Sequence, residues 1–246
     1  MATKERKSKL ISTEQAVSRI KDGNRIMVGG FGLRGCPFQL VNEIAVQGQK
    51  NLTIIAVGGD SPGVGIGALL RNGQISRMVG SHYNANTEVA EARNAGKIEV
   101  DLMPMGNFAE AIRAGGMGIP AFYVPASAGT ELGEGKECRD FNGCPHVLIH
   151  ALKADVALVR AKKADTLGNL VYSKTARNFN PVMATAADYT IAIVDEIVEE
   201  GELDPDTIIT SHIYVDALVP LNVAGKNAKK QYQQLNQYSG LCEEEF

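Results

Sequence analysis

A glycine-rich segment is the part of this sequence best suited to chemistry. It runs Gly29-Gly30-Phe31-Gly32-Leu33-Arg34-Gly35-Cys36-Pro37 and follows three aliphatic residues, where a buried strand is expected to end. Glycines let backbone N–H groups approach a ligand closely, and the start of a following helix adds partial positive charge. These features suit a carboxylate, a phosphate or a developing oxyanion. By residue type alone, the segment also fits a tight strand-to-helix turn that binds nothing.

Read from Gly30, the same segment contains G-x-G-x-x-G, the pattern of a dinucleotide-binding loop. In that loop the third glycine lies in the first turns of the helix. Here Pro37 follows two residues after the third glycine, and a proline inside a helix costs about 3 kcal/mol or more. The helix is therefore expected to start at Pro37. Asp60 comes later than the ribose-binding acid of that motif, and no GK[ST] of a P-loop is present, so a nucleotide cofactor is not favoured.

Strands and helices alternate through the first half of the chain, which predicts parallel βαβ units. The expected strands are 25–28, 52–57, 75–79 and 98–103. The first expected helix starts after Ser12 and is ended by Asp22-Gly23, and the others span 37–47, 65–72, 87–94 and 108–113, the last closed by Gly115-Gly116. In the second half we expect a polar loop over 131–145, strands at 155–160, 170–172, 190–194 and 208–215, and a helix at 180–187. The predicted fold is an α/β fold with an open, mostly parallel sheet and helices on both faces. In such sheets ligands lie at the carboxyl ends of strands, where the glycine segment also lies.

Composition limits the class of protein. The chain has 246 residues, 44% hydrophobic and 22% charged, with a formal net charge of −3, so neither a nucleic acid nor a membrane is an expected partner. The basic N-terminus lacks the apolar stretch of a signal peptide, and no apolar run reaches the roughly 18 residues that span a bilayer. Four cysteines do not make a disulfide framework. We expect a cytoplasmic protein with a single domain over residues 1–225 and a polar tail at 226–246.

The segment Asp22 to Pro37 resembles the signature of family I coenzyme A transferases. That signature has an acid or Asn, a Gly or Asn, two free residues, three apolar residues, Gly-Gly-Phe, three free residues, then Gly, any residue and Pro, and every fixed position is matched. Two further stretches, 109–130 and 157–181, are similar to conserved blocks of the family. The resemblance covers roughly residues 12–219 and is to the A, or alpha, subunit of acetate, butyrate–acetoacetate and 3-oxoacid CoA transferases.

The resemblance implies an enzyme that moves CoA from an acyl-CoA to a short-chain carboxylate through a glutamyl-CoA thioester. Coenzyme A is then a co-substrate, with no permanently bound cofactor. The glutamate of this family lies in the B (beta) subunit, in a Ser-Glu-Asn-Gly-like motif that this chain lacks. No catalytic residue is therefore assigned in this chain. We expect activity only in a hetero-oligomer with the B subunit, such as a heterotetramer, in short-chain fatty acid metabolism.

The resemblance also implies roles for two groups of residues. The expected CoA-facing residues are Gly29, Gly30, Phe31, Gly32, Leu33, Arg34 and Gly35, and the expected substrate-binding residues are Val57, Gly58, Met105, Gly106, Gly115 and Gly116. Family members commonly carry amide side chains where this chain has Val57-Gly58 and Met105. We therefore expect a more apolar pocket and a different acyl group, unless His82, Asn84 or Asn107 supplies the missing hydrogen-bond donors.

Two alternatives remain at this stage. Cys138, Cys144, His146 and His150 lie close together in the sequence, but their spacing is wider than a zinc knuckle, so no metal site is expected. The alternative function is a sugar-phosphate or nucleotide-binding α/β sensor domain without transferase activity.

Overall fold

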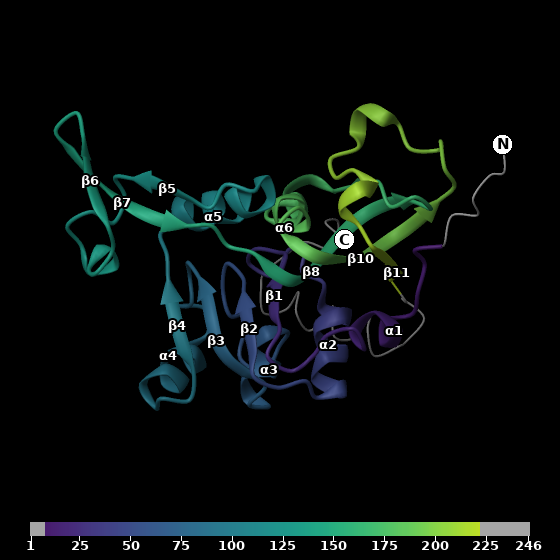
Figure 1. Cartoon of the computed structure of the whole chain (residues 1–246). Helices are drawn as coiled ribbons and strands as arrows, with labels where there is room; N and C mark the ends of the chain where they lie inside the picture. The colour runs from purple at the N-terminus through teal and green to yellow at the C-terminus, as the bar shows by residue number, and fades with distance from the viewer. Residues whose placement is uncertain (1–7, 222–246) are drawn as a thin grey trace.

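In the computed structural model of the protein, residues 8–221 are described. The predicted polar tail at 226–246 lies outside the described residues. Its main sheet consists of β1 (Arg25–Val28), β2 (Leu52–Ile55), β3 (Ile75–Gly80), β4 (Glu99–Leu102), β8 (Ala154–Asp165), β9 (Leu170–Val171), β10 (Ala187–Val198) and β11 (Ala217–Pro220). The strand order is β11-β10-β8-β1-β2-β3-β4, and β9 pairs with β8 at the side of this path (Figure 1). Neighbours along the path are parallel, and β9 is antiparallel to β8.

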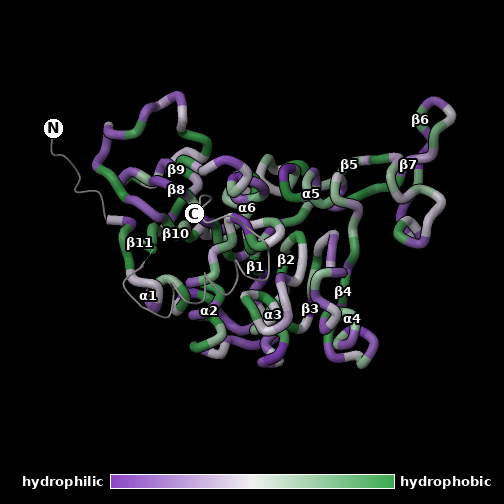
Figure 2. Tube along the Cα trace, turned by 180° about the vertical axis from the view of Figure 1, so that it is seen from behind, coloured by the Kyte–Doolittle hydropathy of each residue, from purple (hydrophilic) through white to green (hydrophobic). Residues whose placement is uncertain are grey.

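Helices cover both faces of this sheet. The helices α1 (Thr13–Val17), α2 (Phe38–Gln47), α3 (Ile66–Arg71) and α4 (Thr87–Asn94) lie on one face, and α5 (Met105–Met117) and α6 (Asn180–Ala184) lie on the other (Figure 1). Successive strand residues point to opposite faces, so Ile26 packs with the first group and Met27 with the second. Figure 2 shows the inner strands as mostly apolar. The predicted fold class is confirmed.

The helices α2 and α4 begin and end where local sequence signals predict, and α1 begins where predicted. The predicted end of α1 at Asp22-Gly23 is wrong, because this helix ends at Val17 with Ser18 as its C-cap. Ser12 caps α1 through a capping box with Gln15, and Gly48 ends α2 in the left-handed conformation. The helix α4 spans Thr87–Asn94, as predicted, and Asn86 caps it by accepting a hydrogen bond from the N–H of Glu88. Short-range capping chemistry therefore determines these boundaries.

The predicted end of α5 is wrong. The helix continues through Gly115 and Gly116 and ends at Gly118, which has φ +74°. A Cβ atom on Gly115 would lie 2.0 Å from the carbonyl oxygen of Leu152, and one on Gly116 would lie 2.3 Å from Oγ1 of Thr185. These two glycines are therefore needed for close packing within the helix and do not form the turn that the sequence predicts.

The predicted polar loop at 131–145 is also wrong in part. It contains a short 3-10 helix, η1 (Glu131–Gly133), and the strand β6 (Cys138–Phe141), which forms a hairpin with β7 (Cys144–His150). Asn142 and Gly143 connect the two strands with φ of +56° and +78°, the geometry that favours an Asn-Gly turn. With β5 (Ala121–Val124), these strands form a separate antiparallel sheet that extends from the main body (Figure 1).

The strand predicted at 208–215 is wrong as well. Thr210 makes an isolated bridge with Leu170, and the next residues form a 3-10 turn, η4 (His212–Tyr214). The last strand, β11, begins only at Ala217. Just before it, the N–H of Asp216 donates to the carbonyl oxygen of Thr190, and the N–H of Thr190 donates to the side-chain carboxylate of Asp216. These two hydrogen bonds align the chain with β10 at this point. The predicted strands at 155–160 and 190–194 are parts of β8 and β10, each 12 residues long.

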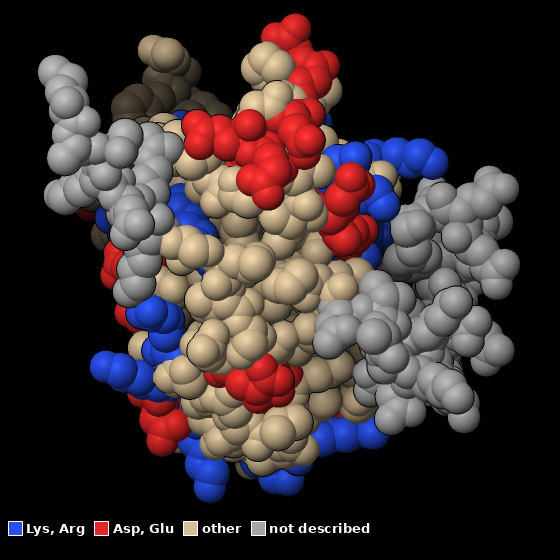
Figure 3. All heavy atoms as spheres, turned by 90° about the vertical axis from the view of Figure 1, so that its right-hand side faces the viewer, with Lys and Arg blue, Asp and Glu red and all other residues tan. Residues whose placement is uncertain are grey.

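Acidic side chains gather at one end of the molecule. The loop between β10 and β11 includes a 3-10 turn, η3 (Pro205–Thr207), and exposes Glu199, Glu200, Glu202, Asp204 and Asp206. Figure 3 shows red side chains at the top of this face and few charges across its middle. This end is therefore unsuited to an anionic ligand. Among residues 8–221, no helix is long and apolar enough to cross a membrane.

Candidate functional site

The glycine segment lies where the direction of the sheet topology reverses. The strand β1 has β2 on one side and β8 on the other. From β1 the next strands, β2 to β4, are added on one side of it, and β8, β10 and β11 are added later on the other side. The segment leaves the carboxyl end of β1, and Gly29 donates its N–H to the carbonyl oxygen of Leu158 at 2.9 Å. Open α/β sheets bind ligands at such a switch point. The predicted position of the segment at the carboxyl end of a strand is confirmed.

The segment folds into a small hairpin. Phe31 and Arg34 exchange two backbone hydrogen bonds, at 3.0 and 3.1 Å, and the two residues between them, Gly32 and Leu33, have φ of +56° and +69°. Positive φ at both central residues is typical of a type I′ turn. The side chain of Phe31 is 48% exposed at this tip. The helix α2 begins at Phe38 with Pro37 as its N-cap, so the helix start that a dinucleotide loop needs is absent here.

Asn180 holds this hairpin in place from the first turn of α6. Its side chain has no solvent exposure. Its Oδ1 accepts a hydrogen bond from the N–H of Arg160 at 2.9 Å, and its Nδ2 donates to the carbonyl oxygens of Gly35 and Ala176, both at 3.0 Å. Asn178 adds a hydrogen bond from its Nδ2 to the carbonyl oxygen of Arg34 at 2.9 Å. The segment 176–180 therefore clamps the glycine hairpin.

This clamp explains two of the glycines. A Cβ atom on Gly29 would lie 2.0 Å from Oδ1 of Asn180, and one on Gly35 would lie 2.3 Å from the carbonyl oxygen of Ala176. Other glycines of the hairpin leave donors available: within residues 8–221, nothing accepts a hydrogen bond from the N–H groups of Gly30 and Gly32. A buried backbone donor without a partner is uncommon, and Gly30 is buried. These N–H groups can therefore bind an anionic atom of a ligand.

The predicted substrate residues lie in several environments. Val57 is buried in the core that also holds Phe108, and a Cβ atom on Gly58 would lie 2.6 Å from the carbonyl oxygen of His82. Met105, the first residue of α5, packs against the same core. Val57 therefore contributes to the core beneath the strand ends, and its proposed contact with substrate stays a prediction.

Near the start of α5, Gly106 lines a surface pocket together with Asn178, Phe179 and Val182. The glycine hairpin and Gly106 therefore both lie against residues 178–182, which follow β9 in the chain. Asn107, one of the alternative donors, directs its Nδ2 toward Ala126 and Oγ of Ser127, at 3.5 and 3.4 Å. Gly115 and Gly116, at the other end of α5, pack against Leu152 and Thr185 as described above.

Two ionisable groups behind the hairpin have raised pKa values because they are buried. Burial raises the pKa of the Asp60 carboxyl to about 6, although a hydrogen bond from the N–H of Ile66 lowers it in part. Burial, followed by the charge of Asp60, raises the pKa of the Cys36 thiol well above its usual value. A thiol with a raised pKa is a poor nucleophile. The structure therefore agrees with the prediction that Cys36 is a packed thiol.

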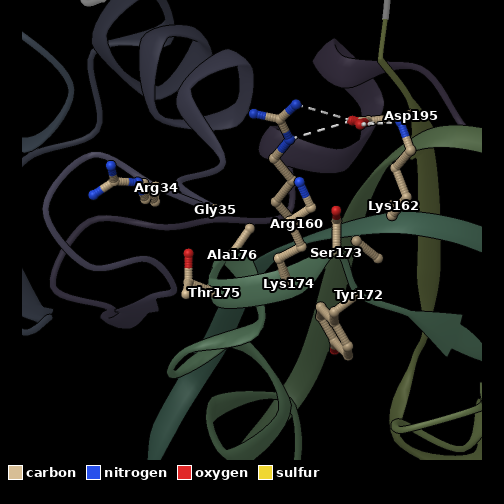
Figure 4. A pocket seen from close by; sticks show the side chains of 11 residues that line it. Arg34, Gly35, Arg160, Lys162, Tyr172, Ser173, Lys174, Thr175, Ala176 and Asp195 are labelled. Carbon is tan, nitrogen blue, oxygen red and sulfur yellow. Dashed lines mark hydrogen bonds and ion pairs between the residues drawn. The ribbon is translucent and has the colours of Figure 1, made fainter. Parts of the chain in front are cut away.

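Sequence reasoning missed a basic pocket beside the hairpin (Figure 4). Its wall includes residues 34–35 of the glycine segment, residues 160–162 of β8, Asp195 of β10 and residues 172–176 around the 3-10 turn η2 (Lys174–Arg177). One signal was present in the sequence: Arg160 and Lys162 alternate along a strand, so they share a face. Their proximity to Arg34 and Lys174 depends on the tertiary fold.

Comparisons with known proteins agree with the resemblance. The family model described as "Coenzyme A transferase" matches residues 10–220. The chain is 48% identical over 210 residues to the A subunit of the probable succinyl-CoA:3-ketoacid coenzyme A transferase of Bacillus subtilis, covering 85% of this chain and 88% of that protein. It is 45% identical over 219 residues to the A subunit of the 3-oxoadipate CoA-transferase of Pseudomonas putida, covering 88% and 95%. Among solved structures, glutaconate coenzyme A-transferase from Acidaminococcus fermentans has a TM-score of 0.76 at 23% identity, over 87% of this chain and 75% of that one.

Proposed function

The chain belongs to the coenzyme A transferase family as an A subunit, and we propose that it forms, with a B subunit, an enzyme that transfers CoA to a short-chain carboxylate. The family match over residues 10–220 supports the reaction class. The names of the relatives, which describe them as A subunits, support the two-subunit assembly. Because these relatives are named as transferase subunits, the sensor-domain alternative is not favoured.

The proposed chemistry uses, as its nucleophile, a glutamate of the B subunit. Its carboxylate attacks the thioester carbonyl carbon of the acyl-CoA, and the C–S bond breaks to release CoA thiolate and an acyl-glutamyl anhydride. The thiolate then attacks the glutamyl carbonyl carbon, which releases the donor acid as its carboxylate and leaves a glutamyl-CoA thioester. The acceptor carboxylate repeats the two steps in reverse. No oxidant, reductant or metal is needed for this exchange.

The part proposed for this chain is stabilisation of negative charge. Each attack places charge on a carbonyl oxygen, and preorganised N–H donors favour that charge in the transition state. The N–H groups of Gly30 and Gly32 have no acceptor within residues 8–221, and the hydrogen bonds of Asn178 and Asn180 hold their hairpin in place. The single observation that carries this proposal is a hairpin at the switch point of the sheet in which the N–H groups of Gly30 and Gly32 have no acceptor among residues 8–221.

The proposal is tested by mixing the chain with its B-subunit partner and assaying CoA transfer from acetyl-CoA to acetate, propionate, butyrate, acetoacetate and 3-oxoadipate. We expect transfer only in the mixture, because the nucleophile lies in the partner. In the absence of acceptor, intact-mass analysis is expected to show the thioester adduct on the partner chain and none on this chain. An adduct on this chain, or transfer without the partner, would contradict the proposal.

A further inference from the structure

The strand β6 forms a free edge of the separate antiparallel sheet that extends from the main body (Figure 1). Within the described residues it pairs only with β7, and all four of its residues are exposed. The N–H of Leu148 in β7 donates to the carbonyl oxygen of Glu137 at 2.8 Å, so the backbone groups of Glu137 face β7. These groups alternate in direction along an antiparallel strand. The N–H and C=O groups of Cys138 and Asp140 therefore face the free edge, where another strand can pair with them.

The charges along this edge are complementary to themselves. The segment 136–140 reads Lys-Glu-Cys-Arg-Asp. When a second copy of the segment lies antiparallel to it with Cys138 opposite Cys138, Lys136 is opposite Asp140 and Glu137 is opposite Arg139. Opposite charges directly across two strands stabilise their pairing, and like charges destabilise it. In this register every charged residue of the segment is therefore opposite a residue of opposite charge.

Neighbouring registers of the same pairing do not have this property. A register centred on Arg139 places Arg139 opposite itself, and one centred on Asp140 places Asp140 opposite itself, so each brings two like charges together. The register centred on Cys138 also uses the free backbone groups. The N–H of Cys138 then donates to the carbonyl oxygen of Cys138 in the second copy, and the N–H of Asp140 donates to that of Lys136. Charge and backbone pairing are thus satisfied together.

Contacts within the chain already hold two of these charges in place. The Nε of Arg139 donates to Oε1 of Glu137 at 2.9 Å, and the hydroxyl of Tyr123 donates to the same oxygen. The guanidinium of Arg139 also lies 5.2 Å from the centre of the Tyr123 ring. Side chains that are fixed before association lose less conformational entropy when a partner binds. Two copies in this register would bring their Glu137–Arg139 pairs together as four charges of alternating sign.

We propose that two copies of this chain pair through the free edges of β6, antiparallel and about a two-fold axis at Cys138. The pairing joins the two three-stranded sheets into one continuous sheet. Such an interface is isologous, because each copy contributes the same segment to it. The contact uses no residue of the glycine hairpin, so it is independent of the proposed CoA transfer.

Charge reversals test this register. In Arg139→Glu and in Glu137→Arg, two attractive pairs across the interface become two repulsive pairs, so the dissociation constant of the two copies is expected to rise at least about tenfold. When the two variants are mixed, each 137–139 pair between them again joins opposite charges, and association is expected to return. Its return would also show that both variants are folded. The matched control is Glu131→Arg, because Glu131 is exposed and lies just before the paired segment.

The association is measured by cross-linking through Cys138, which is exposed. In the proposed register the two Cys138 Cα atoms lie about 5.5 Å apart, within reach of a short bis-maleimide reagent. The full-length chain, alone and mixed with its B subunit, is expected to give a covalent dimer that Cys138→Ser abolishes and Cys144→Ser retains. Sedimentation velocity over a range of protein concentrations follows the same association without a reagent.

The proposal is supported if the cross-linked dimer decreases in both single reversals, returns in their mixture and is unchanged in Glu131→Arg. A dimer that the reversals do not affect, or that their mixture does not restore, would overturn it. If the B subunit protects Cys138 from maleimide and no dimer forms, the edge binds the B subunit, which also overturns the proposal. None of these measurements uses CoA transfer, so a failure of the proposed function leaves their outcome unaffected.

Discussion

Replacing Asn180 by alanine tests the clamp on the glycine hairpin. The change removes three hydrogen bonds of 2.9–3.0 Å, one from the N–H of Arg160 and two to the carbonyl oxygens of Gly35 and Ala176. It also removes a longer one to Oδ1 of Asn178, at 3.3 Å. Each of the three shorter bonds contributes about 1 kcal/mol net, so the free energy of unfolding is expected to fall by about 3 kcal/mol. The hairpin is also expected to lose its fixed position, which lowers kcat more than it raises KM, because preorganised donors act mainly in the transition state.

The geometry allows a sharper form of this test. A Cβ atom on Gly29 would lie 2.0 Å from Oδ1 of Asn180, so Gly29→Ala must displace the amide group. Asn180→Ala removes that amide and with it the two shortest contacts, and leaves the carbonyl oxygen of Leu158 at 3.3 Å from the same methyl group. The two substitutions together are therefore expected to destabilise the protein by at least about 1 kcal/mol less than the sum of the single effects, as for residues in direct contact.

The assay is urea unfolding of the assembled enzyme at one fixed protein concentration, since association contributes to stability. CoA transfer is measured on the same samples. Asn94→Ala is the control, because Asn94 is exposed at the end of α4, and it is expected to change the free energy of unfolding by less than about 0.5 kcal/mol. Additive effects of Gly29→Ala and Asn180→Ala, or a loss below about 1 kcal/mol for Asn180→Ala, would refute the reasoning.

Three further results are expected. In urea unfolding, Gly115→Ala should lower the free energy of unfolding by about 2 kcal/mol, because the new methyl group overpacks the helix. Gly106→Ala in the same helix should raise this free energy by about 0.5 kcal/mol, because nothing lies within 4 Å of its Cβ position. Because burial raises the pKa of Asp60 to about 6, the charged carboxylate is disfavoured in the folded state, and the contribution of Asp60 to the free energy of unfolding is lost as the pH rises from about 4 to about 6. The difference in the free energy of unfolding between wild type and Asp60→Asn, measured across this pH range, should show the loss. A difference that does not change with pH would contradict it. In timed alkylation at pH 7 followed by mass spectrometry, the exposed Cys138 should react well before the buried Cys36, and equal rates would show that Cys36 is accessible.

The regular part of the fold could be predicted because its signals are local. The capping box at Ser12 and the left-handed Gly48 mark helix ends through interactions between residues a few positions apart. The alternation of apolar strands and helices is enough to indicate a parallel sheet. Where the prediction of the α5 boundary failed, the role of the residue depends on a contact that is distant in sequence. Gly115 lies inside the helix, where the close approach of the Leu152 carbonyl oxygen leaves no space for a side chain. The Asn142-Gly143 turn was a local signal that the sequence interpretation overlooked.

The sequence by itself determined the family and the position of the glycine segment after a strand, because a motif is a property of neighbouring residues. Only the tertiary structure decided what surrounds that segment. Asn180 is 145 positions from Gly35, and they meet because β1 and β8 are adjacent in the sheet. The same adjacency brings Arg34 to the basic residues of β8 and η2. Spacing along the chain carries no information about such contacts, since they depend on which strands pair and in which register.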